Sequence, residues 1–512
     1  MRIHLCLAFI FVAVAQSHAA SLPADAQKLL ESFPEKKITL PLVLSRAIGA
    51  SDSFKTVAAR AASIPSSEYE SKAPIDTVVL LGTSREVNRN QPISPFGATR
   101  TIQGGNSLGA RSGFRTGTQL AVEVSDSYFD AVFSGFPGAS SKFTNVKVEA
   151  SQSLWRDFLG SGTRAGLLAG KSATEAAKLE WWDSVDQWVL DLVTIYYQAW
   201  GLQARVTAAE RSLERRDRLK KIISVRAKRG TAETPDLLQV DGAMTAARSE
   251  VLDARQNLLV IWRNLIISLK MPEEWLKIDP ADVPLALEKT IAPTLEACES
   301  SQVPATSPSV EMANLRRESA EGRADALVDR VRPDLSLKAS VNSNAVAGYT
   351  STVGFDSRFS DAIAGKNPAW TLGLQLQFPI GAYTERAAAS RAVADRDQAI
   401  AAASMMKDQL KVDWLNHCGD LARWKKVLAD QKSLLEKMQE RVRLEETRYQ
   451  QGRTSPTQVI QAGDDATSAE LGLRNAEVQL HLAAWKVRRL QGEIRTEIRK
   501  LDTEKRLDQA GL

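Results

Sequence analysis

The feature that most constrains this chain is that much of its sequence is written twice. Without a gap, a long segment beginning at Arg164 superposes on a second beginning at Arg386. Identical residues recur along both copies. After Gly230 and Gly452, apolar or small residues fall alternately three and four positions apart. This spacing is typical of helices that pack along a coiled-coil seam. The doubling therefore predicts a repeated helical architecture rather than one globular core.

Each copy predicts two antiparallel helices joined by a turn. Residues 163–229 and 385–451 contain no proline, and at about 1.5 Å per residue each segment would form a helix on the order of 100 Å long. The turn glycines, Gly230 and Gly452, can adopt the left-handed conformation that ends a helix, and the Thr, Ser and Pro residues after them suit a helix start. Alanine at many seam positions favours close approach of neighbouring helices.

Before each long helix the hydrophobic period changes from helical to two. In the second copy, residues 335–341 and 371–378 alternate, and the loop 342–368 between them is rich in Gly, Ser, Asn and Asp. Strands with one apolar and one polar face are typical of membrane hairpins around a wet lumen. The first copy offers three candidate strands, separated by long Gly/Ser-rich loops. The sequence leaves open which two pair and which belongs to an inserted hairpin: 75–81, 120–124 and 146–150.

The chain divides into five segments. Residues 1–19 run from Arg2 through an apolar stretch to Ser17 and Ala19, which predicts a secretory signal peptide cut after Ala19 and an exported chain. Beyond it, no stretch is long and apolar enough for a transmembrane helix. A first repeat, residues 20–270, has an entry helix, strands and a helical hairpin turning near 230, and a Pro-rich connector follows at 271–309. A second repeat, residues 310–492, turns near 452, and the polar tail 493–512 is expected to be a fraying helix.

The composition argues against an enzyme. The 512 residues include four histidines and three cysteines, of which His4, His18 and Cys6 lie in the signal. Little material remains for a metal cluster or a histidine-based triad, so no catalytic residue, metal or cofactor is predicted. A net charge of +5 requires no nucleic-acid partner. Cys298 and Cys418 are too far apart in sequence to argue a bridge, and both are expected to be free thiols.

Short motifs recur at the joints between the predicted elements. They are Gln152, Leu154, Trp155, Arg156 and Gly160 leaving a strand, Arg332 to Leu335 leading into one, Gln377 to Gly381 leaving another, and Arg448, Tyr449 and Gly452 followed by Val459 to Ala462 around the second turn. With the doubled order of elements, from about residue 38 to 494, this pattern resembles the TolC-like outer-membrane efflux proteins, the outer membrane factors.

The resemblance implies a mainly α fold with a membrane β part. Long coiled-coil-like helical hairpins would form an α-barrel, and a homotrimer would share a transmembrane β-barrel with four strands from each protomer. The protein would sit in the lipid of the outer membrane and extend into the periplasm. It would serve as a passive exit duct of a tripartite efflux or type I secretion system. Energy would come from an inner-membrane pump or ABC transporter, reached through a periplasmic adaptor (membrane fusion protein).

Two other functions remain open at this point. A periplasmic adaptor also uses a helical hairpin, although normally only one, and a structural coiled-coil spacer would explain the heptads while leaving the alternating strands without a role. The sequence does not name the cargo, because a wide, water-lined duct selects little.

The resemblance also points to the two turns as a gate at the periplasmic tips. In the family, an acidic pair follows the second-turn glycine at the places held here by Gln458 and Gln461, and a gating arginine is displaced to Arg453, leaving Thr454 at its usual position. An acidic gate at that level is therefore not expected. The gate is instead expected to be rebuilt from residues of both turns: Gly230, Asp236, Gly452, Arg453, Thr454, Gln458 and Gln461.

A basic run within residues 215–229 lies just before the first turn. One interpretation is a surface that docks an acidic adaptor tip, and the other is a solvated helix face that complements the negative end of the helix dipole. The residues expected to contact an adaptor are Arg226, Lys228, Arg229 and Arg448.

Overall fold

A computed structural model describes residues 37–89, 97–133, 137–229, 233–287, 292–299, 303–348 and 353–502. The predicted signal, residues 1–19, lies outside the described residues. The chain folds into two compact units. The helical unit takes the described residues of Met1–Ala59, Ser184–Pro304 and Asp413–Gly511, and the sheet unit takes those of Arg60–Asp183 and Ala305–Val412.

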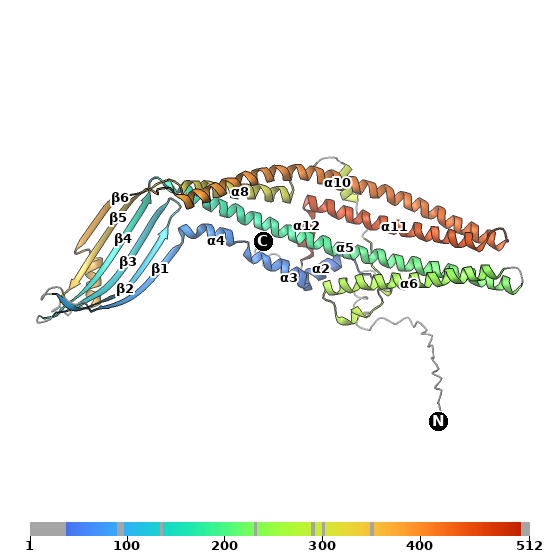
Figure 1. Ribbon diagram of the computed structural model, residues 1–512, viewed down its shortest axis with the longest axis horizontal. Helices are drawn as coiled ribbons and strands as arrows, with labels where there is room; N and C mark the ends of the chain where they lie inside the picture. The colour runs from blue at the N-terminus through green and yellow to red at the C-terminus, as the bar shows by residue number, and fades with distance from the viewer. Residues whose placement is uncertain are drawn as a thin grey trace, which may run out of the picture. The chain divides into compact units, whose positions relative to one another are not determined.

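The sheet unit is built on one antiparallel sheet whose strands lie side by side in chain order (Figure 1). Each neighbouring pair is linked by an unbroken or nearly unbroken ladder of backbone partners. The strands are β1 (Thr77–Asn88), β2 (Ala98–Gly113), β3 (Thr118–Phe133), β4 (Ala139–Ser153), β5 (Asp334–Ala347) and β6 (Pro368–Gln377).

The described sheet has six strands, so the expectation of four per protomer is wrong. The strand that sequence reasoning placed in a loop is β2, because glycine and polar residues hide its alternation. These glycines fit the strand between its neighbours. A Cβ atom at Gly104 would lie 2.8 Å from the Tyr128 hydroxyl oxygen and 2.4 Å from the Ser84 carbonyl oxygen. The register of β2 therefore depends on the flanking strands more than on its own side chains.

The two faces of the sheet differ sharply in polarity. Side chains of directly paired residues share a face. One row across all six strands is Val79, Ala110, Val122, Val148, Val341 and Trp370, linked by successive pairings. Neighbouring rows extend this face, which we call the apolar face, with Leu81, Leu108, Leu120, Val124, Val146, Leu335, Leu337, Leu372, Leu374 and Leu376.

The opposite face, which we call the polar face, carries hydrogen-bonding and charged side chains. It includes Gln119, Glu123, Lys147, Glu149, Ser151, Ser336, Lys338, Asn342, Gln375 and Gln377, with Val78 and Leu80 of β1 as apolar exceptions. The alternation predicted for the second-copy strands is thus present in the structure, and it extends to the first copy.

Short helices complete the sheet unit beside the first part of α5 and of α10. The loop predicted at 342–368 is not wholly irregular: β5 extends into it, and it contains a helix, α9, that packs on β4 and β5. The elements are η2 (Arg60–Ser63), α4 (Ser66–Lys72), η3 (Ala73–Ile75), η4 (Phe158–Gly160), α8 (Pro308–Asp329) and α9 (Phe355–Ile363).

Two helices of 68 residues each confirm the predicted long helices. In the helical unit, α5 pairs with α6 and α10 pairs with α11. The bounds of these four helices are α5 (Ser161–Lys228), α6 (Thr234–Ser268), α10 (Tyr383–Gln450) and α11 (Pro456–Gln491). The other helical elements are short: α2 (Leu40–Ala50), α3 (Asp52–Ala59), η5 (Glu273–Leu276), η6 (Pro280–Asp282), α7 (Ala292–Glu299) and α12 (Glu493–Leu501).

The helix pairs are held by narrow seams rather than a thick core. Between α5 and α6, Val206 and Ala209 pack on Ala254 and Leu258. The equivalent cluster between α10 and α11 contains Trp414, Leu421, Leu480, Ala483, Ala484 and Val487. Buried alanines lie in both seams, as the heptad pattern predicts, and they allow the helix axes to approach closely.

Two expectations for the helical unit are wrong. Cys298 and Cys418 form a disulfide, with Cα atoms 5.4 Å apart, although 120 residues separate them in sequence. Tertiary structure brings α7 of the connector against α10, which sequence distance alone could not show. The start of the polar tail is also not a fraying helix. In α12, Ile494 and Ile498 are fully buried, and the helix packs against α2.

Among the described helices, none combines the length and apolar character needed to cross a membrane.

Candidate functional site at the paired helical turns

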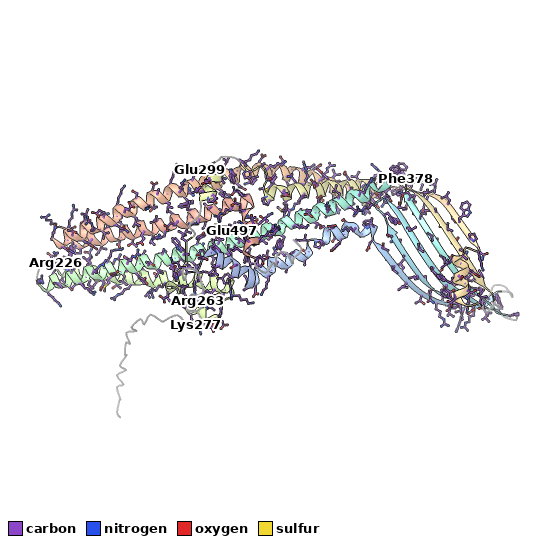
Figure 2. The ribbon with its side chains drawn as sticks, turned by 180° about the vertical axis from the view of Figure 1, so that it is seen from behind. Arg226, Arg263, Lys277, Glu299, Phe378 and Glu497 are labelled. Carbon is purple, nitrogen blue, oxygen red and sulfur yellow. A yellow bond between two sulfur atoms is a disulfide. The ribbon has the colours of Figure 1, made fainter. Side chains whose placement is uncertain are left out.

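The first turn joins α5 to α6. Arg226, labelled near the end of α5 in Figure 2, lies in the last helical turn, and α6 begins at Thr234 with Pro235 directly after it. Proline suits this position because the first helical amide has no partner within the helix. Asp236 follows in the first turn of α6, where a carboxylate stabilises the positive end of the helix dipole. Gly230 lies outside the described residues.

The second turn ends α10 with a complete glycine cap. Gly452 has φ 73°, in the left-handed region that glycine adopts without strain. Its amide donates to the Tyr449 carbonyl oxygen at 3.0 Å, and the next amide, of Arg453, donates to the Arg448 carbonyl oxygen at 2.8 Å. This pair of hydrogen bonds is a Schellman motif, which satisfies the last carbonyls of the helix. The turn then passes through Thr454 into α11.

The two turns are joined through a small buried cluster. Tyr449 is only 4% exposed and packs with Ile223, Val240 and Val459, so all four helices meet around its ring. The Arg226 guanidinium carbon lies 4.8 Å from the centre of this ring, and its Nη2 donates to the Gln450 carbonyl oxygen at 2.8 Å. Burial raises the pKa of the Tyr449 phenol, and Arg226 opposes that rise. The phenol is therefore neutral at physiological pH.

A second link between the turns is polar and exposed. The Gln239 and Thr457 side chains exchange hydrogen bonds of 3.0 and 3.1 Å, which tie α6 to α11. Gln458 and Gln461, one helical turn apart on α11, both have exposed side chains, as does Arg453. Asp236 is half-buried. The structure thus brings residues of both turns into one tip, with the glutamines on its surface.

Much of the basic run before the first turn is occupied by contacts within the chain. Arg216 pairs with Asp464 of α11 at 2.5 Å, and Arg215 donates to the Thr467 hydroxyl at 2.6 Å. On the other side, Lys220 pairs with Asp241 of α6 at 2.6 Å. These contacts favour a packing role for Arg215, Arg216 and Lys220, which lie farther from the turn.

The end of the basic run is different. Within the described part of the chain, Lys228 and Arg229 form no ion pair, and both side chains are exposed. Arg448, beyond the run on α10, pairs with Glu445 of the same helix at 3.1 Å and also remains exposed. Positive charge is therefore concentrated at the tip itself, where the helix dipoles of α5 and α10 end.

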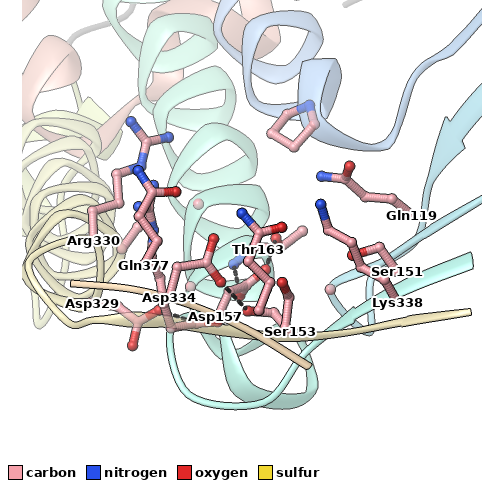
Figure 3. A pocket seen from close by; sticks show the side chains of 18 of the residues that line it. Gln119, Ser151, Ser153, Asp157, Thr163, Asp329, Arg330, Asp334, Lys338 and Gln377 are labelled. Atoms are coloured by element: carbon pink, nitrogen blue, oxygen red, sulfur yellow. Dashed lines mark hydrogen bonds between the residues drawn. The ribbon is translucent and has the colours of Figure 1, made fainter. Parts of the chain in front are cut away.

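A second candidate site is a polar cavity of about 570 Å³ in the sheet unit, where the polar face meets the start of α5 and the end of α8 (Figure 3). Asp157 organises it. Its carboxylate accepts hydrogen bonds from the Thr163 amide at 2.8 Å and the Thr163 hydroxyl at 2.6 Å, and its own amide donates to Asp329 at 2.6 Å. These bonds tie the beginning of α5 to the end of α8.

The close approach of the turn between β2 and β3 explains the glycine of the strand-to-helix motif. Gly160 has φ 76°, and a Cβ atom there would lie 1.8 Å from the Arg115 carbonyl oxygen in the turn between β2 and β3. Only glycine fits this position. Charged side chains of both signs line the cavity, and no three His, Cys, Asp or Glu side chains within the described ranges are arranged to hold a metal ion.

Comparison with known proteins places this architecture. No protein-family model and no curated protein matches the sequence. Solved structures do match. The outer-membrane channel OprN is 17% identical with a TM-score of 0.63, covering 88% of this chain and 89% of its own. The outer membrane protein VceC from Vibrio cholerae is 15% identical with a TM-score of 0.62, covering 88% and 95%. The Campylobacter jejuni CmeC outer membrane channel is 11% identical with a TM-score of 0.62, covering 98% and 99%.

The fold is that of the TolC-like outer-membrane channels. The alignment extends over nearly the whole of CmeC, so both the sheet and the helical hairpins take part in the likeness. OprN and CmeC are themselves outer-membrane channels. Sequence reasoning missed Tyr449 as the buried centre of the tip and Asp157 as the organiser of the cavity. Tyr449 belongs to the motif around the second turn, but nothing in that motif marks its side chain as buried, and no local pattern marks Asp157, three residues before Gly160.

Proposed function

We propose that this chain is one protomer of a homotrimeric outer-membrane exit duct that serves a tripartite efflux or type I secretion system. The likeness to outer-membrane channels supports the proposal at the level of the fold. The duct is passive, and its energy comes from an inner-membrane pump or ABC transporter reached through a periplasmic adaptor. The protein is located in the outer membrane and extends into the periplasm.

The observation that carries this proposal is the difference between the two faces of the sheet. The apolar face continues across all six strands and is widely exposed: Leu81 is 82% exposed, Trp370 77% and Leu374 69%. An exposed apolar patch of this kind would cause a water-soluble monomer to aggregate. In a membrane the patch contacts lipid instead of water, so its exposure is no longer unfavourable. The polar face would line a water-filled lumen.

The edges of the sheet support assembly into a ring. Every residue of the edge strands β1 and β6 is exposed, and on its outer side neither strand has a partner among the described residues. Unpaired backbone groups are costly in lipid. Pairing of β1 in one copy with β6 in the next would satisfy both edges, and three copies close the ring.

The gate of the duct is formed by the helical tips. The Arg226 contacts to Tyr449 and Gln450 and the Gln239–Thr457 pair hold the turns of the two repeats together in the closed state. Surface residues around them line the constriction or meet the adaptor. The gate comprises Gly230, Asp236, Gly452, Arg453, Thr454, Gln458 and Gln461, and the adaptor contacts are Arg226, Lys228, Arg229 and Arg448.

Cysteine labelling in intact cells tests the location. Gly348, after β5, is exposed with no atom near its missing Cβ, and Arg453 is exposed in the helical tip. A membrane-impermeant maleimide should label Gly348→Cys from outside but leave Arg453→Cys unlabelled until the outer membrane is opened. Labelling of both sites or of neither, or recovery of the protein as a salt-soluble periplasmic monomer, would contradict the proposal.

The gate has its own test. Arg226→Ala removes both contacts to the second turn, whereas Arg205→Ala, further back on the same helix, removes only an exposed charge. In cells, Arg226→Ala should raise the uptake of a large antibiotic that normally cannot cross the outer membrane, and Arg205→Ala should not. Equal uptake in the two variants would show that the tips do not hold the duct closed.

A further inference from the structure

Helix α9 lies on the apolar face of the sheet, not over the lumen. Its Arg358 reaches Asp126 of β3 and Thr144 of β4, which are directly paired. Each of these two residues is two positions from a member of the apolar face, Val124 and Val146 respectively, which are also paired. Because side chains alternate along a strand, all four share one face. The position of α9 therefore follows from the register.

The helix is fixed there by a buried ion pair. The Arg358 side chain is only 4% exposed and donates from Nη2 to both carboxylate oxygens of Asp126, at 2.9 and 3.2 Å. Its Nε donates to the Thr144 hydroxyl at 3.2 Å, and its Nη1 donates to the Val353 carbonyl oxygen at 2.7 Å. A buried guanidinium with this set of partners holds one geometry. Ala362, on the same side of the helix, is 1% exposed.

A different side of α9 carries an apolar stripe. Phe355, Phe359 and Ile363 are spaced four residues apart and so lie along one line of the helix. The two rings stack with centroids 5.6 Å apart, yet Phe355 remains 45% exposed and Ile363 62%. The exposed polar residue Ser357 lies on the side of the helix opposite this stripe, because successive residues are about 100° apart around the axis. The helix thus has three sides: one against the sheet, one apolar and one polar.

This three-sided pattern fits a helix at a membrane surface. Amphipathic helices of this kind bury their apolar side at the boundary of headgroups and acyl chains. The stripe lies on the same face of the sheet as Trp370 and Leu372, which are 77% and 62% exposed. Charge gives no reason to prefer anionic headgroups, because Arg358 is paired with Asp126 and Lys366 is paired with Asp361.

We propose that α9 is an interfacial helix whose Phe355, Phe359 and Ile363 insert among the acyl chains of the outer leaflet around the protein. The inference rests on the proposed outer-membrane function and adds to it a specific lipid contact. The helix would brace the outer end of β5, where Ala345 and Ala347 are 5% and 4% exposed. It would also set how deeply the sheet sits in the bilayer.

Site-directed spin labelling tests the proposal on the whole protein in neutral phospholipid vesicles. Cys298 and Cys418 are joined, so in a chain lacking Cys6 an introduced cysteine is the only free thiol. Ile363→Cys probes the stripe, and Ser357→Cys, on the opposite side of the same helix, is the matched control. Leu374→Cys on the apolar face reports the proposed membrane span. Each nitroxide is exposed in turn to oxygen, which concentrates in lipid, and to a nickel chelate, which stays in water.

We expect the ratio of oxygen to nickel accessibility to be several-fold higher at Ile363 than at Ser357, and high at Leu374. A high ratio at Leu374 with equal ratios at Ile363 and Ser357 would overturn the role of α9 and leave the proposed channel intact. Low ratios at all three positions would overturn the membrane function itself, and the role of α9 with it.

Discussion

The disulfide allows the sharpest test of the helical unit. Cys298 in α7 is joined to Cys418 in α10, closing a loop with a sequence separation of 120 residues. In a chain-entropy treatment, a cross-link over that span restricts the unfolded chain enough to stabilise the fold by roughly 5 kcal/mol. The same treatment makes the value depend only weakly on loop length, so a small error in the effective span changes little. We therefore expect the serine pair Cys298→Ser with Cys418→Ser to lose about 3 to 5 kcal/mol.

Other contacts should keep α7 in place without the cross-link. Leu295 packs beside the cluster that contains Trp414 and Leu480, and Arg488 donates to the Thr294 hydroxyl at 3.3 Å. The variant should therefore fold and show the same helical circular dichroism. Its urea midpoint should be lower, and hydrogen exchange should increase first in residues 292–299.

The control is the unmodified protein under strong reductant, which should unfold at the same urea concentration as the serine variant. Two results would refute the reasoning. One is an equal midpoint for the oxidised protein and the variant. The other is an electrophoretic mobility that does not change on reduction, since that would mean that the bond is absent.

Three further predictions follow from single positions. Gly160→Ala should destabilise the connection between β4 and α5, because Gly160 has a positive φ and an added Cβ would clash with the Arg115 carbonyl oxygen. Gly166→Ala, in open space within α5, should instead stabilise the protein by about 0.5 to 1 kcal/mol. Shifts of the thermal unfolding temperature in the same direction for both variants would contradict this. Ala476→Leu, at a fully buried seam position, should cost about 1 to 3 kcal/mol in chemical denaturation, and the exposed Ser468→Leu on the same helix should cost almost nothing. Hydrogen bonds from Lys270 and, to a smaller extent, from Lys55 lower the pKa of Asp52 from its ordinary value of 3.8 to about 2. The ionised carboxylate therefore stabilises the fold fully above pH 3.8, and this stabilisation is lost as the pH falls toward 2. Asp52→Asn should flatten the acid limb of the stability profile, and identical acid limbs in both proteins would argue against the pairing.

The long helices could be predicted from sequence because their signal is local and repeated. A heptad seam recurs in both copies, and the turn glycine with a following proline marks each end. The second-copy strands were predictable for the same reason, since Leu335, Leu337 and Leu372 alternate plainly. Because the unit is duplicated, the same hydrophobic register is present at equivalent positions of both copies.

The missed features depend on partners distant in sequence. Strand β2 has glycines where a strand normally shows bulky residues, and the ladders to β1 and β3 supply its register. Helix α9 is short, and it is held by Asp126 and Thr144 from far earlier in the chain. The disulfide needed the placement of α7 on α10, which no spacing rule contains. At the tip, no local pattern in the sequence marks Tyr449 as the side chain buried between the two turns.

The additional pair of strands would change the size of the opening. A ring of three such chains would have eighteen strands in place of twelve, and because barrel diameter rises roughly in proportion to strand number, its outer mouth would be about half again as wide. Barrels of sixteen to eighteen strands leave an open aqueous passage. Any constriction would then have to come from the helical turns rather than from the sheet, and single-channel conductance in planar bilayers would report the width of the opening directly.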